Sequence, residues 1–193
     1  MSVPIQLTRL RQMLADAAPR AEPSRGRQAA VALVLAPDPD EAGSLSLLLV
    51  RRSEREGDPW SGHMALPGGH ADATDADLLQ TARRETLEEV GIDLIDAELL
   101  GRLDDVTTLR SFDIMIRPFV FWTSTQRPVT LSDEIAEALW VPLNALAGDT
   151  LRSTREVTVR GATLRVPAYV IGERVVWGMT FSLLERLASQ SLA

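Results

Sequence analysis

Residues 66–92 constrain the fold of this chain more than any other stretch of the sequence. A Pro-Gly-Gly turn is followed by a polar stretch and then by apolar residues at helical spacing, which predict a helix over about 75–90. Thr74 followed by Asp77 resembles a capping box at the helix start, and Gly91 is placed to end the helix. The residues expected on its buried face are Leu79, Ala82, Thr86 and Val90.

The end of this predicted helix carries three glutamates, Glu85, Glu88 and Glu89, at i, i+3 and i+4. Like charges at this spacing repel by a few tenths of a kcal/mol per pair. The last helical turn also favours cations over anions, by roughly 0.3–1 kcal/mol each. Arg84 can pair with Glu88 and offset part of this cost. A divalent cation would convert the repulsion into coordination, and an all-oxygen ligand set favours Mg²⁺ or Mn²⁺. The simpler alternative is an acidic helix face in water.

The sequence of residues 84–92, RETLEEVGI, resembles the end of the Nudix box, in which Arg-Glu is followed by Glu-Glu and then by Gly. Gly69 corresponds to the glycine that opens the box, and Gly68 lets the backbone approach the site without a Cβ. The resemblance implies the Nudix α/β/α sandwich with a mixed central sheet. It also implies metal ligands at Gly69, Glu85, Glu88 and Glu89, with Arg84 orienting the glutamates.

The box departs from the usual pattern at its first acid. The usual Glu stands eight residues before the Arg, where this chain has Ala76, and the acid is Asp75 one residue earlier. A loop that is one residue longer and carries Asp resembles the coenzyme A pyrophosphatase branch of the family. Residues 48–53 with 62–69, and residues 176–180, resemble two further signatures of that branch, although residues 54–61 match it poorly. Asp75 is therefore a weak candidate for the first acid of the box.

Arg52 and Glu134 are the candidate site residues outside the box. Adjacent strand residues point to opposite faces, so at most one of Arg51 and Arg52 should face the pocket. Arg52 occupies the signature position and is expected to bind phosphate, because guanidinium groups form paired bonds to phosphate oxygens. A solvated strand-end arginine is the alternative. Glu134, preferred over Glu137, is expected to assist the water or the metal, and a surface charge run is the alternative.

His63 and His70 flank the Gly-Gly turn, where a catalytic base is conceivable but a loop or packing role is more common. The large aromatic residues are expected in the core rather than against the substrate, since large aromatics are usually buried. These are Trp60, Phe112, Trp122, Trp140 and Trp177.

The bulk properties predict one domain over residues 1–193, with an N-terminal helix at about 5–17 and a core at about 28–187. A net charge of −7 excludes a fold-wide basic surface for nucleic acid. The absence of cysteine excludes disulfides and thiol chemistry. Without a signal peptide or a long apolar run, we expect a cytoplasmic protein that does not bind membranes. The final helix, with Phe181, Leu184 and Leu187, is expected either to pack on the domain or to form a homodimer contact.

The function implied by the resemblance is metal-dependent hydrolysis of a diphosphate linkage in a nucleotide derivative. Coenzyme A or acyl-coenzyme A is the leading substrate. The alternatives are ADP-ribose, a dinucleotide or an oxidised nucleoside triphosphate. A non-catalytic nucleotide sensor with this fold is expected to have lost box acids that this chain retains. A prenyl-diphosphate isomerase of this fold would need a cysteine that the chain lacks.

Overall fold

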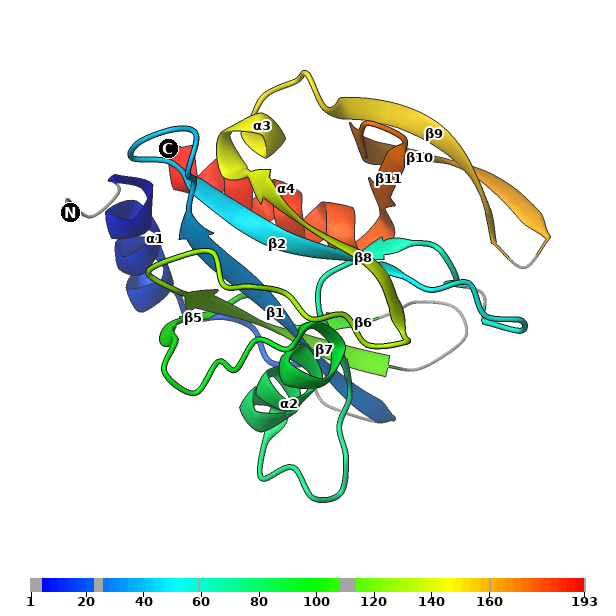
Figure 1. The fold of residues 1–193 in the computed structure, drawn as a ribbon, viewed down its shortest axis with the longest axis horizontal. Coiled ribbons are helices and arrows are strands. Elements are labelled where there is room, and N and C mark those ends of the chain that lie inside the picture. Colours follow the sequence, from blue (N-terminus) through cyan, green and yellow to red (C-terminus); the bar gives the residue numbers. More distant parts are fainter. Residues whose placement is uncertain (1–4, 23–25, 59, 108–113, 160, 193) are drawn as a thin grey trace.

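The computed structural model describes residues 5–22, 26–58, 60–107, 114–159 and 161–192 (Figure 1). Within these residues, helices alternate irregularly with strands, as expected from the sequence. The helices are α1 (Ile5–Asp16), α2 (Leu78–Val90), α3 (Leu143–Ala147) and α4 (Gly178–Leu192). The strands are β1 (Arg27–Pro37), β2 (Leu45–Arg52), β3 (Met64–Ala65), β4 (Gly68–His70), β5 (Glu98–Arg102), β6 (Val106–Thr107), β7 (Ile114–Trp122), β8 (Ile135–Pro142), β9 (Arg152–Val159), β10 (Ala162–Ile171) and β11 (Arg174–Trp177).

Strand β1 lies at the centre of the larger sheet. It pairs in parallel with β7 and antiparallel with β2 and β4, so the sheet is mixed. Successive β1 side chains enter two separate apolar clusters, one on each face of the sheet. Ala29, Val31, Leu33 and Leu35 enter one cluster, and Ala30, Ala32 and Val34 enter the other. An uninterrupted apolar run therefore marks a strand that is covered on both faces.

The helices cover these two faces (Figure 1). Buried side chains of α1, α3 and α4 belong to the first cluster, whereas those of α2 belong to the second. The sheet thus lies between helices, which confirms the α/β/α sandwich with a mixed sheet. Phe181, Leu184 and Leu187 of α4 are buried in the first cluster, so this face packs on the domain. No described helix is both long and apolar enough to cross a membrane.

The segment from β3 to β4 fills a gap between two diverging strands. Strands β1 and β2 pair directly only over Leu35–Pro37 and Leu45–Leu47. Farther along, β2 pairs with β3 and β1 pairs with β4. The N–H of Ala32 also donates to the carbonyl of Pro67 at 2.8 Å. The Gly-Gly turn is therefore held inside the sheet rather than on its surface.

The structure corrects the predicted start of α2. The helix begins at Leu78 instead of residue 75, and its N-cap is Asp77, whose carboxylate accepts from the N–H of Gln80 at 2.8 Å. Thr74 instead donates to Asp72 in the preceding turn. Several polar side chains before the helix can each accept from a nearby backbone N–H. The sequence alone therefore did not identify which of them caps the helix. The helix ends as expected at Gly91, which is left-handed with φ 70°.

Candidate active site

A cavity of about 770 Å³ opens beside the Gly-Gly turn. This volume lies within the range of small-molecule sites. Its walls come from β1, β2, the β3–β4 segment, the end of α2 and the junction of β11 with α4. Arg52, Gly68, Gly69 and Glu89, all expected at the site from the sequence, line this cavity. Glu85, Glu88 and Glu134 are not among its lining residues.

Glu89 is the box glutamate that lines the cavity, and its side chain has almost no exposure to solvent. The residue is 5% exposed, and its carboxylate accepts from the N–H of Gly68 at 2.9 Å. Gly68 has φ 147°, and a Cβ there would lie 2.2 Å from the carbonyl oxygen of Ala30. Only glycine fits this approach. Burial, aided by the charge of Glu85, raises the pKa of Glu89 to about 7, although that N–H and the charge of Arg52 oppose the rise.

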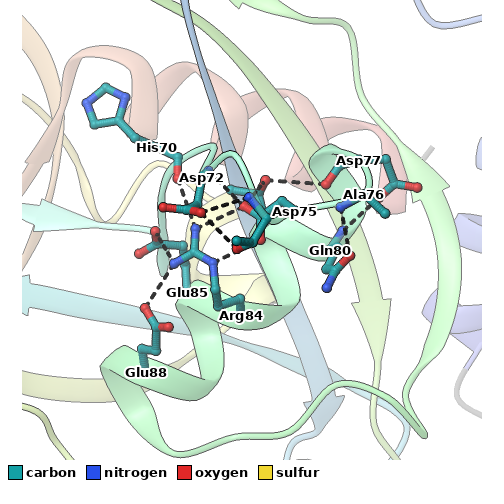
Figure 2. Close-up of polar contacts among 11 residues, drawn as sticks. His70, Asp72, Asp75, Ala76, Asp77, Gln80, Arg84, Glu85 and Glu88 are labelled. Carbon is teal, nitrogen blue, oxygen red and sulfur yellow. Dashed lines mark hydrogen bonds and ion pairs between the residues drawn. The ribbon is translucent and has the colours of Figure 1, made fainter.

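Glu85 and Glu88 lie outside the cavity wall and are both bonded to Arg84. Their carboxylates accept from its Nη1 at 2.8 and 2.9 Å, as Figure 2 shows. A Cβ at residue 69 would lie 2.5 Å from the Glu85 carboxyl group, so Gly69 makes room for that side chain. Burial raises the pKa of Glu85, and the Arg84 guanidinium opposes the rise. The Glu88 side chain is 57% exposed. Although they are spaced at i, i+3 and i+4, these acids thus lie in three different environments.

Asp75 holds Arg84 in place. Its two carboxylate oxygens accept from Nε and Nη2 of Arg84, each at 3.0 Å, and its side chain is 3% exposed (Figure 2). The carbonyl of His70 accepts from Nη2 at 3.0 Å as well. The Arg84 guanidinium holds the pKa of Asp75 well below its ordinary value. The acid that is displaced by one residue in sequence therefore still meets the arginine of the box.

The residues at this site fit a divalent cation. In the described part of the chain, no three acidic or histidine side chains are already gathered as a metal site. Glu85 and Glu89 are nevertheless two desolvated carboxylates whose pKa values are raised, and a nearby cation would relieve both. The absence of a Cβ at Gly69 lets the Glu85 carboxyl group lie directly against the Gly69 backbone. Carboxylate oxygens with a backbone carbonyl form a donor set that suits Mg²⁺ or Mn²⁺.

Arg51 and Arg52 separate as strand geometry predicts, although a bulge interrupts the pairing between them. Arg51 bonds Glu137 on β8, whereas Arg52 lines the cavity. Nη2 of Arg52 donates to Asp58 at 2.8 Å. Its Nε is buried and has no hydrogen-bond partner within the described residues. Arg52 therefore has donor capacity left for an anion.

Glu134 and Glu137 occupy different settings. Glu134 pairs with Arg55 at 3.0 Å and is exposed, but its charge still raises the pKa values of Glu85 and Glu89. It therefore lies within electrostatic reach of the acids without lining the cavity. Glu137 is bonded to both Arg51 and Arg174, an ion network that ties β8 to β11. Its carboxylate is already occupied by these two arginines.

The structure overturns the assignment of all large aromatics to the core. Trp60, His63 and Trp177 line the cavity together, although Trp60 lies in a polar loop and Trp177 at the end of β11. Trp122 and Trp140 pack against the two apolar clusters as expected, and Phe112 lies outside the described residues. A tryptophan inside a polar loop was the available signal, because such a loop has no core of its own to bury it. His70 lines the cavity near the acids.

Comparisons with known proteins agree with this geometry. Residues 26–160 match the NUDIX domain. An uncharacterized Schizosaccharomyces pombe protein is 37% identical over 153 residues, which cover 68% of this chain and 46% of that protein. An uncharacterized Nudix hydrolase, NudL, of Pectobacterium atrosepticum is 32% identical over 165 residues, covering 85% of this chain and 82% of that protein. A MutT/nudix family protein from Enterococcus faecalis shares the fold with a TM-score of 0.59 and 18% identity, covering 97% of this chain and 68% of that one. The chain therefore belongs to the Nudix hydrolase family.

Proposed function

We propose that this protein hydrolyses the diphosphate linkage of a nucleoside diphosphate derivative, and that coenzyme A or an acyl-coenzyme A is the substrate. The observation that carries the proposal is that a buried glutamate and an incompletely bonded arginine line one cavity. Glu89 is a buried carboxylate with a raised pKa, and the buried Nε of Arg52 has no partner in the described structure. Together they suit a cation and a phosphate, respectively.

The chain's own residues divide the work of the reaction. A bound divalent cation neutralises phosphate charge and lowers the pKa of water. Glu85, Glu88, Glu89 and the carbonyl of Gly69 would hold it. Arg52 would bind a phosphate oxygen, and the N–H of Gly68 keeps the Glu89 carboxylate in place. Arg84 orients the carboxylates of Glu85 and Glu88 through hydrogen bonds from its Nη1. Water adds its oxygen to one phosphorus and releases a proton to solvent, the bridging P–O bond breaks, and the departing phosphate leaves with the electron pair of that bond.

The coenzyme A assignment rests on the two sequence signatures and on where they lie. Arg52, His63 and Gly68 belong to the upstream signature region, and Trp177 belongs to the downstream one. All four line the same cavity. Two segments that resemble the same branch and contribute to one site support a common substrate. The expected products are a phosphopantetheine half and adenosine 3′,5′-bisphosphate.

The test is product release with Mg²⁺ or Mn²⁺ across a substrate panel. The panel contains coenzyme A, acetyl-coenzyme A, ADP-ribose, NADH, diadenosine polyphosphates and nucleoside triphosphates. We expect coenzyme A or its acetyl derivative to give the highest kcat/KM. Preferential cleavage of another member would contradict the coenzyme A assignment but retain diphosphate hydrolysis as the reaction. No cleavage by folded protein that binds metal would favour the nucleotide sensor instead.

Variants of the acids test the site within the same assay. Glu89→Gln and Glu88→Gln should each abolish turnover while circular dichroism shows an unchanged fold. Arg51→Gln is the matched control, because Arg51 is adjacent to Arg52 but bonds Glu137 and does not line the cavity. Full activity of both glutamine variants would contradict the assigned metal site.

A further inference from the structure

Three aromatic rings from separate parts of the chain meet at the cavity wall. The Trp60 and Trp177 ring centroids lie 6.1 Å apart with planes inclined at 41°. His63 contacts Trp60 at 5.9 Å and Trp177 at 5.3 Å, in both cases with an edge-to-face arrangement. These separations fall in the range of favourable aromatic pairs. We call these three residues the aromatic cluster.

The aromatic cluster presents ring surface to the cavity. Trp60 is 39% exposed, and it is the one aromatic among the large apolar side chains that are exposed in the described part of the chain. Its neighbours Trp177 and His63 are only partly exposed, so they fix the Trp60 ring from the side. Burial lowers the pKa of His63, so its ring is neutral at neutral pH and adds aromatic surface rather than charge.

A hydrogen-bonded turn ties the aromatic cluster to the phosphate-binding candidate Arg52. The carboxylate of Asp58 accepts from Nη2 of Arg52 at 2.8 Å and from the N–H of Trp60 at 3.0 Å. The backbone of Arg52 exchanges bonds with this turn, accepting from Gly62 at 3.2 Å and donating to His63 at 3.1 Å. These hydrogen bonds thus fix the position of Arg52 relative to the aromatic rings.

We propose that the aromatic cluster binds the nucleobase of the substrate, which stacks on Trp60, and that it favours phosphate compounds that carry a base over those that do not. The proposal rests on the proposed function in one respect, since the substrate's diphosphate would occupy the acidic end of the same cavity. A centroid separation of 6.1 Å leaves no room for a base between the two indoles, so the base stacks on the cavity side of Trp60. Stacking on an aromatic tolerates any base, because every base has a π-face.

Asp58 is the positioning residue of this arrangement. It touches neither the base nor the diphosphate in the proposed mode, but it orients the Arg52 guanidinium and the Trp60 backbone. The poorly matched stretch between the two halves of the upstream signature contains both Asp58 and Trp60. The local departure from the branch thus coincides with the stacking residue Trp60 and its positioning residue Asp58.

The test compares AMP with ribose 5-phosphate, two ligands that differ only in the base. Calorimetric titration of the full chain measures both dissociation constants and requires no turnover. In the unmodified protein we expect AMP to bind roughly ten- to a hundredfold more tightly. Trp60→Ala should bring the two constants close together, whereas Trp60→Phe should keep most of the difference. Trp177→Ala should have an intermediate effect because its ring supports Trp60.

Trp140→Phe is the matched control, because Trp140 packs against the second apolar cluster and does not line the cavity. It should leave the AMP preference unchanged. A preference for AMP that survives Trp60→Ala, or equal binding of the two ligands by the unmodified protein, would overturn the base site. This result is separable from the proposed function. Hydrolysis without an AMP preference removes only the base site, and an AMP preference without hydrolysis removes only the reaction.

Discussion

Two of the arginines that pair with aspartates, Arg84 and Arg52, differ in how completely the guanidinium is bonded. Arg84 donates to Asp75 through two nitrogens and also to Glu85, Glu88 and the carbonyl of His70. Arg52 donates to Asp58 through Nη2, and its buried Nε has no partner within the described residues. A guanidinium has five N–H donors. Arg84 is therefore engaged in holding the fold of the site, whereas Arg52 retains donors for a ligand.

Removal of Arg84 should give the largest change in stability. Arg84→Gln would leave the carboxylate of Asp75, which is 3% exposed, without its main partner. Breaking such a pair from one side costs roughly 3–4 kcal/mol of unfolding free energy. The pKa of Asp75 is held below its ordinary value, so this contribution is present above about pH 4 and is lost as pH falls below it.

Urea unfolding at pH 7 and at pH 3 measures this difference. Arg11→Gln is the control, because Arg11 also makes two bonds to one carboxylate, that of Glu98, but on the exposed surface. It should cost less than about 1 kcal/mol. Equal losses in the two variants would show that the burial of Asp75 has no energetic consequence.

The second prediction concerns Glu89, the one of the three box glutamates that Arg84 does not bond. Burial raises its pKa to about 7, so the charged form destabilises the fold. Glu89→Gln retains an acceptor for the N–H of Gly68 and removes the charge. Without metal, the variant should match the unmodified protein below about pH 4.5 and gain stability as pH rises to about 7, up to about 3 kcal/mol.

Thermal unfolding between pH 4 and 8 tests the Glu89 prediction. Glu88→Gln serves as the control, since that carboxylate is exposed and bonded to Arg84. At pH 7 its stability should differ from that of the unmodified protein by less than that of Glu89→Gln does. Added Mg²⁺ should raise the Tm of the unmodified protein more than that of Glu89→Gln. A flat pH profile for Glu89→Gln would contradict the burial argument.

Arg52→Gln should affect the reaction more than the fold. Loss of a charge-assisted bond to phosphate predicts a decrease in kcat/KM of roughly ten- to a hundredfold. The unfolding free energy should change by less than about 1 kcal/mol, because the Asp58 pair is partly exposed. Steady-state kinetics alongside urea unfolding separates the two effects. A stability loss as large as that of Arg84→Gln would abolish the contrast between the two arginines.

The smallest effect is expected for Asp58→Asn. The amide retains an oxygen that can accept from the N–H of Trp60 but loses the charge that orients Arg52. We expect KM to rise by about threefold while kcat changes little, since a partly exposed pair contributes less than about 1 kcal/mol. A loss larger than that of Arg52→Gln would mean that Asp58 itself contacts the substrate.

Local patterns in the sequence predicted the helix that carries the box glutamates, although α2 begins at Leu78 rather than at residue 75. Gly91 predicted the end of α2. The Glu85, Glu88 and Glu89 spacing predicted one cluster of acids, whereas the structure gives each of the three a different environment. These features depend on residues within one or two turns of each other, where periodicity and end-capping chemistry act directly.

Tertiary structure alone determined the environment of each site residue. Glu89 and Glu88 are neighbours in sequence, but the Gly68 turn packs over Glu89 whereas Glu88 faces solvent. The cap of α2 moved to Asp77 because Thr74 is held in the turn that also brings Asp75 to Arg84. Trp60 and Trp177 meet only because β11 lies against β3. Burial and contacts between distant segments are properties of the packed chain, and no local pattern encodes them.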